Sequence, residues 1–140
     1  MVEFLNMKKN ANKYGNKKIS VGDLIFDSTK EYRRFLVLKQ AQENGLISEL
    51  TLQPKWEVLP AKKETYVKHL KTKDKVCERT LMLPIHYTAD FSYMKDGELI
   101  VEDVKSTPKL LSRDVPLRLK LMKYFHGIDV RLVYDVNAEI

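Results

Sequence analysis

Cysteine is nearly absent from the sequence, and so are long apolar runs. A single cysteine, Cys77, can form neither an internal disulfide nor a zinc site built on cysteines, which disfavours extracellular disulfide scaffolds. The longest apolar runs, such as residues 81–85, are far shorter than the roughly 20 residues that span a membrane. Residues 1–5 lack the basic-then-apolar order of a signal peptide. We therefore expect a protein that stays in the cytoplasm and has no membrane partner.

Several signatures of catalysis are also missing. The sequence has no Gly-rich phosphate loop, no Gly-x-Ser-x-Gly elbow and no His-Glu-x-x-His pair, so nucleotide hydrolysis, serine esterase chemistry and zincin chemistry lack their markers. The three histidines, His69, His86 and His126, are dispersed, and we assign none of them a ligand role.

Basic residues outnumber acidic ones. The chain has 140 residues, and its 25 Lys and Arg against 19 Asp and Glu leave a net charge of +6, which favours anionic partners such as nucleic acid or a phospholipid surface. With 44% apolar residues, this length suits one compact domain. We assign residues 1–18 to a flexible basic arm and residues 19–140 to a single domain. Within that domain, residues 61–83 are a basic insertion, either an exposed loop or a protruding hairpin, whose partner is DNA or another protein.

Local sequence patterns predict a mixed order of helices and strands. Short turn dipeptides such as Asp96-Gly97 predict hairpins, and the series Ser28-Thr29-Lys30-Glu31 matches a helix capping box. The expected elements are a hairpin over 19–26, a helix over 29–43 ending at Asn44-Gly45, strands over 47–59, 85–94 and 98–105, a second helix, and a strand over 128–136. Pro54 requires that the strand over 47–59 either lies at an edge or bends. The second helix is capped by Asp114, ends at Gly127, and is expected to have Leu117, Leu121, Tyr124 and Phe125 on its apolar face. This order fits an α/β or α+β fold in which helices flank a mixed sheet.

The hairpin that turns at Asp96-Gly97 brings two carboxylates together. If these are the two turn residues, Asp90 faces Asp103 across the strands. Lys105 shares their face, because side chains alternate along a strand, and Glu102 points the other way. Two like charges directly opposite, with Cβ atoms roughly 4.5–5.5 Å apart, destabilise a sheet.

A divalent cation would explain this acidic pair, because Mg²⁺ prefers hard oxygen ligands and often uses only one or two carboxylates together with phosphates. The alternatives are that one strand frays, that a bulge shifts the register, or that Lys105 merely neutralises a solvated acidic patch. Glu31 is a third acidic candidate, since its position on the helix turns it toward the apolar face that packs on the sheet. The competing interpretation of Glu31 is the capping box alone.

The series Thr88-Ala89-Asp90 followed by Asp103-Val104-Lys105 resembles the PD-(D/E)xK nuclease superfamily, with Ala89 in place of the proline. Longer stretches resemble a small phage-borne endonuclease-like family, described as Holliday-junction-resolvase-like. These stretches are residues 13–15, 26–31, 52–55, 87–91 and 101–105. The segment over 62–80 is longer and more basic than the usual connection of that family.

The resemblance implies a restriction-endonuclease-like fold, a mixed sheet flanked by helices with core order α-β-β-β-α-β, preceded by the basic arm and a hairpin. It also implies that Asp90 and Asp103 bind Mg²⁺, or Mn²⁺ as a substitute, with help from the Val104 carbonyl. Glu31 completes the site, and Lys105 handles the attacking water or the developing charge.

Further candidates lie outside this group of residues. Gln53 matches a recurrent position of the phage-borne family, although a strand residue bonded to the backbone is an equally good interpretation. Eight basic residues could contact DNA phosphates, or could be ordinary surface cations. They are Lys8, Lys9, Lys13, Lys109, Arg113, Arg118, Lys120 and Lys123.

From these observations we expect a Mg²⁺-dependent DNA endonuclease of phage or prophage origin, acting on branched or structured DNA in the bacterial cytoplasm. A resolvase makes two symmetrical cuts, so this version of the hypothesis predicts a homodimer. The alternatives are a noncatalytic DNA-binding or phage accessory module on a nuclease fold, or a general nicking nuclease.

Overall fold

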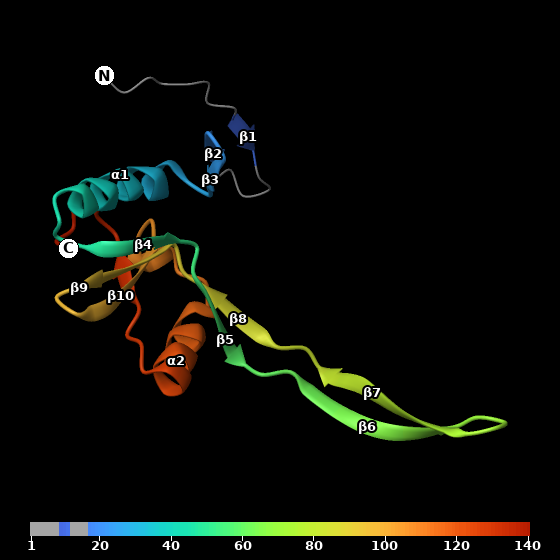
Figure 1. Ribbon diagram of the computed structural model, residues 1–140. Coiled ribbons are helices and arrows are strands. Elements are labelled where there is room, and N and C mark those ends of the chain that lie inside the picture. Colours follow the sequence, from blue (N-terminus) through green and yellow to red (C-terminus); the bar gives the residue numbers. More distant parts are fainter. Residues whose placement is uncertain (1–8, 12–16) are drawn as a thin grey trace. The chain divides into compact units, whose positions relative to one another are not determined.

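The contacts within the chain divide it into two compact units, each described by itself below. The computed structural model describes residues 9–11 and 17–140. The first unit comprises Met1–Pro54, Ala89–Ser112 and Val130–Ile140, and the second comprises Lys55–Thr88 and Arg113–Asp129. Both units contain a helix of more than two turns and strands, which confirms the expected mixed α+β class (Figure 1). Among the described residues, no helix is long and apolar enough to cross a membrane.

The first unit begins with a small antiparallel sheet in the order β1-β2-β3. Its strands are β1 (Lys9–Ala11), β2 (Lys17–Val21) and β3 (Leu24–Phe26). The turn between β2 and β3 consists of Gly22 and Asp23, and Gly22 adopts a positive φ of 60°, which glycine tolerates best. The hairpin predicted here is confirmed.

Helix α1 (Thr29–Glu43) has the predicted bounds. The Ser28 hydroxyl accepts a hydrogen bond from the Glu31 N–H at 3.1 Å, so an otherwise unpaired donor of the first turn is satisfied. Beyond the other end, Gly45 has a φ of 78°, the left-handed conformation that stops a helix. Leu38 is fully buried against the sheet described next.

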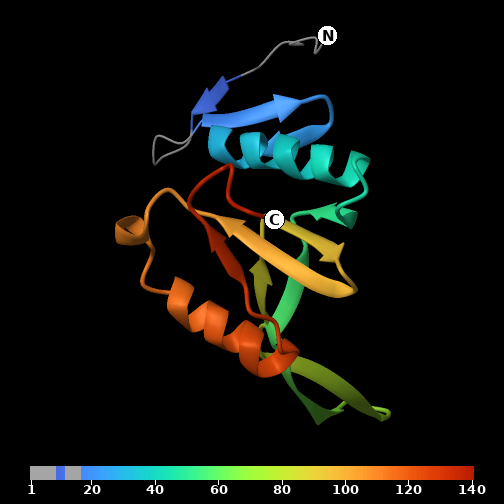
Figure 2. The same cartoon turned by 90° about the vertical axis from the view of Figure 1, so that its left-hand side faces the viewer.

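The main sheet of the first unit has the order β11-β10-β9-β4. Its strands are β4 (Ser48–Leu52), β9 (Phe91–Lys95), β10 (Glu98–Val104) and β11 (Arg131–Val133). Strands β10 and β11 are parallel, whereas the other neighbours are antiparallel, so the sheet is mixed. Helix α1 packs against β4 and β10, and Figures 1 and 2 show it along one face of the sheet. The last strand is shorter than the predicted one.

A buried ion pair joins α1 to the middle of this sheet. Arg34 donates from Nε and Nη2 to the two carboxylate oxygens of Glu102 at 2.9 and 2.7 Å, and both residues are 0% exposed. Tyr93 donates its hydroxyl to Glu102 at 2.7 Å. Arg34 also donates from Nη1 to the carbonyls of Val136 and Ala138 at 2.9 and 2.7 Å. Every charged atom of the pair is therefore hydrogen-bonded, as burial of charge requires.

Two strands that the sequence predicts as continuous are each split in two. Strand β4 is followed by β5 (Lys55–Leu59), and β8 (Ile85–Thr88) is followed by β9. Pro54 has no N–H to donate, and the preceding Gln53 has a φ of 50°, so the ladder cannot continue through this point. The Ala89 N–H instead donates to the Pro54 carbonyl at 3.0 Å, which places the two breaks opposite each other.

The second unit contains two antiparallel ribbons. One pairs β5 with β8, and the other pairs β6 (Lys62–His69) with β7 (Asp74–Met82). Of the two interpretations of the basic insertion, exposed loop or hairpin, the structure shows the hairpin.

Helix α2 (Val115–His126) shows that the predicted apolar face was wrong. The buried residue is Met122, whereas Tyr124 is 83% exposed. Leu117 and Phe125 are also exposed. Apolar residues recur at helical spacing on more than one side of this helix, so periodicity alone could not select the side that packs against β5.

Candidate active site

The backbone leaves the main sheet at Asp90 and turns its carboxylate toward β10. The paired register of β9 and β10 runs from Lys95–Glu98 to Phe91–Glu102, as predicted, and then stops. At the next position Asp90 Oδ2 accepts a hydrogen bond from the Val104 N–H at 2.7 Å. The Asp90 side chain thus takes the place of a backbone acceptor, which holds it beside the end of β10.

Asp103 and Lys105 lie together at that end of β10. Lys105 Nζ is 3.1 Å from Asp103 Oδ2, and the Asp103 side chain is 8% exposed while that of Lys105 is 30% exposed. Asp103 is also within side-chain hydrogen-bond reach of Asp90. The predicted proximity of the two aspartates and the lysine is confirmed, although the ladder itself ends at Phe91 and Glu102, before the predicted pair of Asp90 and Asp103.

The electrostatics of Asp90 are those of a carboxyl group that resists ionisation. The pKa of Asp90 is raised from 3.8 to about 9. Burial is the largest cause, followed by the negative charges of Glu31 and Asp103 and by the side-chain hydrogen bond with Asp103. The Val104 N–H acts in the opposite direction because it stabilises the carboxylate. Without a cation nearby, the protonated form of Asp90 is favoured at neutral pH.

Glu31 serves the helix cap and also lies within electrostatic reach of the aspartates. Its Oε2 accepts a hydrogen bond from the Asp27 N–H at 3.2 Å, next to the Ser28 contact described above. The pKa of Glu31 is raised to about 7. Burial is the largest cause, the hydrogen bond from Asp27 acts in the opposite direction, and the charges of Asp27 and Asp103 add to the rise. The two interpretations of Glu31 therefore do not exclude each other.

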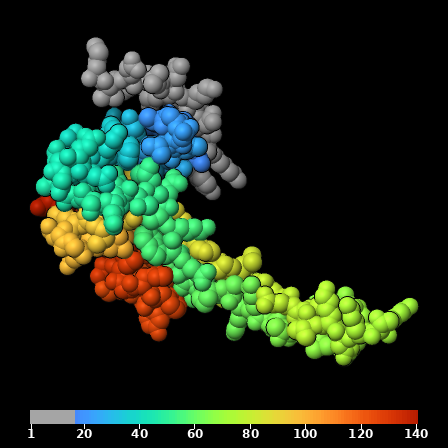
Figure 3. Space-filling view, viewed as in Figure 1, coloured from blue at the N-terminus to red at the C-terminus, as the bar shows by residue number. Residues whose placement is uncertain are grey.

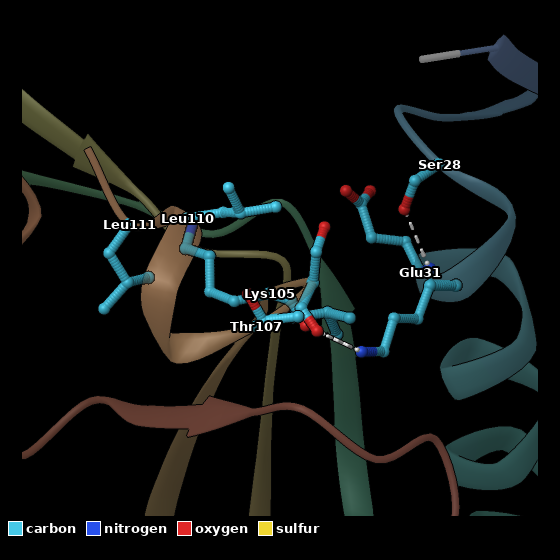
Figure 4. Close-up of a pocket in the computed structure, with 9 residues that line it drawn as sticks. Ser28, Glu31, Lys105, Thr107, Leu110 and Leu111 are labelled. Atoms are coloured by element: carbon cyan, nitrogen blue, oxygen red, sulfur yellow. Dashed lines mark hydrogen bonds between the residues drawn. The ribbon is translucent and has the colours of Figure 1, made fainter. Parts of the chain in front are cut away.

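A cavity of about 220 Å³ opens beside Glu31 and Lys105. Figure 4 shows Ser28 and Glu31 on one side of it and Lys105 and Thr107 on the other. Since a water molecule takes about 30 Å³ of liquid volume, this space suits several waters or a phosphate group with its hydration. Its lining is mainly polar around Glu31 and is closed by two leucines, Leu110 and Leu111.

Lys30 is a residue of this site that sequence analysis missed. Its Nζ donates to the carbonyls of Lys105 at 2.8 Å and Ser106 at 3.2 Å, so it ties the segment after β10 to the start of α1. No signal in the sequence pointed to it, because an exposed-looking lysine in the first turn of a helix is ordinary. Lys30 is a positioning residue, since it acts through the backbone that carries Lys105.

Gln53 lies close to the same group but is engaged with the backbone. Its N–H donates to the Asp90 carbonyl at 2.9 Å, and its side-chain Nε2 donates to the Ile25 carbonyl at 3.4 Å. Together with Glu31 and Asp90, it lines a small hollow of about 10 Å³. Gln53 is therefore bonded to the backbone, although it lies just after β4 and not within the strand, and an accessory role at the site stays a prediction.

The donor set suits a hard cation only in part. Asp90 and Asp103 offer carboxylate oxygens side by side, as Mg²⁺ prefers. Within residues 9–11 and 17–140, however, no group of three or more His, Cys, Asp or Glu side chains is arranged closely enough to hold a metal ion. The two aspartates are therefore the ligand pair to consider, and a metal-ligand role for Glu31 stays a prediction.

The basic residues suggested for DNA contact differ in their surroundings. Lys8 and Lys13 lie outside the described residues, and Lys9 begins β1. Arg118 and Lys123 are held by acidic neighbours, Asp114 at 2.8 Å and Asp129 at 2.6 Å. The remaining three are exposed: Lys109, Arg113 and Lys120.

Comparison with known proteins gives one match. Residues 11–138 match the model of a family described as "Protein of unknown function (DUF1064)". The chain belongs to this family. No curated protein and no solved structure matches it. The DUF1064 match includes all four residues predicted to be catalytic: Glu31, Asp90, Asp103 and Lys105.

Proposed function

We propose that the chain is a Mg²⁺-dependent endodeoxyribonuclease, which hydrolyses phosphodiester bonds in DNA. The observation that carries this proposal is the group formed by Asp90, Asp103 and Lys105. Two adjacent, largely buried carboxyl groups are costly when both ionise, and a cation between them removes that cost. Glu31, a carboxyl group whose pKa is raised, lines the cavity together with Lys105, and such perturbed groups at a cavity are typical of functional sites.

The order of elements along the chain supports a restriction-endonuclease-like fold for this proposal. When the two ribbons β5–β8 and β6–β7 are left aside, the elements α1, β4, β9, β10, α2 and β11 follow the core order α-β-β-β-α-β. The site residues lie where β9 and β10 end, next to α1, as the resemblance to PD-(D/E)xK nucleases implies.

Asp90 and Asp103, with the Val104 carbonyl, would hold Mg²⁺, and Mn²⁺ as a substitute. When bound, such an ion neutralises phosphate charge and supports both the attacking water and the leaving oxygen. Glu31 adds negative charge near this pair.

Lys105 is the residue that we propose to act on the reacting atoms. A lysine held by Asp103 at 3.1 Å is oriented to stabilise negative charge that develops on the phosphate. In the hydrolysis, the water oxygen forms a new bond to phosphorus and the bridging P–O bond breaks. The attacking water loses one proton, and the leaving oxygen of the DNA strand gains one to become a hydroxyl group.

The choice of branched or structured DNA rests on the resemblance to the Holliday-junction-resolvase-like family. One active site makes one cut, so symmetrical resolution of a four-way junction requires two copies of the chain. We therefore propose a homodimer as the active form on that substrate.

A noncatalytic DNA-binding module is the second candidate. It is favoured by the lack of a three-ligand group for a metal within the described residues. In this case the acidic pair would be a remnant of a nuclease site, and DNA binding would remain without cleavage.

A cleavage panel separates these candidates. Four-way junction, flap, linear duplex and single-stranded DNA are each incubated with Mg²⁺ and with EDTA, using wild-type protein, Asp103→Ala, Lys105→Ala and the exposed α1 variant Lys39→Ala as a control. We expect Mg²⁺-dependent cleavage with preference for the junction, a loss of about 10²- to 10⁴-fold in the two site variants, and wild-type rates for Lys39→Ala. Cleavage retained in both site variants would reject the site. Binding without cleavage by any form would favour the noncatalytic module.

A further inference from the structure

The β6–β7 hairpin has both of its faces open to solvent. Apolar side chains on it are exposed, among them Tyr66 (41%), Val67 (51%) and Val76 (73%). Figure 3 shows the hairpin, in green to yellow-green, at the surface of the second unit. A two-stranded ribbon of this kind buries little apolar surface by itself and is marginally stable in water. We therefore expect the hairpin to contact a partner.

The acidic side chains of the hairpin are all engaged by basic ones within it. The pairs are Glu64 with Arg79, Glu78 with Lys63 at 3.2 Å, and Asp74 with His69 at 2.8 Å. The contacts with Arg79 and Lys63 offset the charges of Glu64 and Glu78, and the contact of His69 with Asp74 is a hydrogen bond.

Four further lysines surround the hairpin tip without such partners. They are Lys68, Lys71, Lys73 and Lys75, all exposed, and no ion pair to an acidic residue is formed by any of them in the described part of the chain. Lys68 and Lys75 are direct cross-strand partners in the register. Like charges directly opposite each other destabilise a sheet, so the tip holds a repulsion that an external polyanion would relieve.

We infer that the β6–β7 hairpin is a DNA-binding arm whose four tip lysines contact the phosphates of a duplex. The selection of DNA as the polyanion rests on the proposed function. The shape fits, because the major groove of B-DNA admits a two-stranded β-ribbon. Strand β6 has 8 residues, and at about 3.3 Å per residue such a strand extends over roughly 26 Å, somewhat less than one helical turn of DNA.

The chemistry of the arm favours binding without sequence preference. Lysine contacts phosphate as a point charge, whereas recognition of guanine is typically the task of an arginine fork. The one arginine of the hairpin, Arg79, is bound to Glu64 and lies over the Tyr66 ring at 5.4 Å from its centroid. Its guanidinium is therefore already occupied.

A second copy of the chain is a poorer occupant of this surface. Two hairpin tips docked on each other would bring eight lysines together, which is unfavourable without counter-charge. The exposed Val67 and Val76 are cross-strand partners and form one small apolar pair near the tip. That pair is small beside the roughly 800 Å² per partner that a stable interface buries.

The test measures binding of full-length protein to labelled duplex DNA by fluorescence anisotropy in EDTA, so that cleavage plays no part. The arm variant is Lys68→Ala with Lys75→Ala. The matched control is Arg33→Ala with Lys39→Ala, which removes the same charge from exposed positions of α1. Log K falls as log salt rises, and we expect this negative slope to become less steep by about 1.8 in the arm variant, the value for two phosphate contacts. The control should keep the wild-type slope, and duplexes of unrelated sequence should bind alike.

The outcomes keep this inference apart from the proposed nuclease function. Equal salt slopes for the arm variant and wild type would overturn the arm, whether or not the protein cleaves DNA. Arm-dependent binding by a protein that never cleaves would support the arm and reject the nuclease. Self-association lost in Val67→Ser with Val76→Ser, together with unchanged DNA binding in the lysine variant, would place a second copy on the hairpin and overturn the inference. Removing Lys68 and Lys75 relieves repulsion, so a failure of the arm variant to fold is not expected.

Discussion

The backbone N–H of Val104 donates a 2.7 Å hydrogen bond to the carboxylate of Asp90. The contact joins two strands through one side chain at the point where their ladder ends. Because the donor is a backbone group, the orientation of Asp90 does not depend on the identity of the side chain at position 104. The carboxylate is therefore fixed beside Asp103 by the fold itself.

Replacement of Asp90 by Asn should remove a pH-dependent loss of stability. The pKa of Asp90 rises from 3.8 in the unfolded chain to about 9 in the folded one. Between these values the folded state binds more protons, so stability is present below the lower value and is lost as the pH rises through the higher one. We expect the metal-free wild type to lose on the order of 1 kcal/mol per pH unit across part of this window. Asp90→Asn should lose clearly less.

The measurement is urea unfolding in EDTA at several values from about pH 5 to about pH 9. Asn keeps an oxygen that can accept the Val104 hydrogen bond, so the variant is a close structural match. Asp135→Asn is the control, because Asp135 is an exposed aspartate distant in sequence. A wild-type protein whose stability does not change with pH would contradict the raised pKa.

Addition of Mg²⁺ should raise the melting temperature more at high pH than at low pH. Mg²⁺ competes with protons for the carboxyl groups of Asp90 and Glu31. Because the pKa values of both groups are raised, protons compete strongly at neutral pH and below. Thermal melts with Mg²⁺, compared with NaCl at equal ionic strength, measure the difference. The shift should be absent in Asp103→Ala. A shift of the same size at about pH 5 and about pH 8 would indicate binding elsewhere.

The variants Glu31→Gln and Ser28→Ala should distinguish the capping of helix α1 from the contribution of the Glu31 charge to cleavage. Gln can still accept the Asp27 hydrogen bond, so the helix start is retained while the charge near Asp103 is lost. We expect Glu31→Gln to fold normally and to reduce cleavage about 10- to 100-fold. Ser28→Ala should cost about 1 kcal/mol of unfolding free energy while cleavage by the folded protein is retained.

These two variants are compared by urea unfolding and by initial cleavage rates on the preferred DNA. Full activity in Glu31→Gln would assign this residue to the cap alone. Thr29→Ala, at the first helical position, controls for a general effect of substitution at the start of α1.

Removal of either partner of the Arg34–Glu102 pair should be far more damaging than removal of both. Both side chains are 0% exposed, so Arg34→Met leaves the Glu102 carboxylate buried without its bidentate partner and with Arg131 at 3.6 Å as its remaining cationic neighbour. We expect each single variant, Arg34→Met or Glu102→Leu, to lose about 3–5 kcal/mol. The double variant should recover a substantial part of this loss, as measured by a double-mutant cycle in urea. Additive losses would show that the two residues act independently.

Local sequence signals predicted the elements that depend on nearest neighbours. The bounds of α1 follow from Ser28 and Gly45, and the β9–β10 register follows from Asp96 and Gly97, because caps and two-residue turns act over a few residues. That register alone predicted that Asp90 and Asp103 lie close together.

Local sequence patterns could not predict the features that depend on contacts between distant parts of the chain. The contact of Lys30 with the carbonyl of Lys105 spans 75 positions, and the buried side of α2 is chosen by β5 rather than by its own periodicity. At Pro54 the sequence predicted an edge position or a bend, but not a break, because the counterpart of the break at Ala89 lies between β8 and β9, far along the chain. The hairpin over the basic insertion was one of two options, because its strands bury too little to leave a clear apolar alternation.

The fully buried bond between Arg34 and Glu102 also constrains the opposite side of the sheet. Glu102 and Asp103 are consecutive in β10, so they point to opposite faces, and a shift of the strand by one residue would exchange them. A slip in one direction would place Val101 opposite Arg34, and a slip in the other direction would place the shorter Asp103 there and remove it from the site. In neither case would the two hydrogen bonds from Arg34 to Glu102 form. The arginine therefore acts as a register lock, which penalises every alignment of β10 that would misplace Asp103 and Lys105.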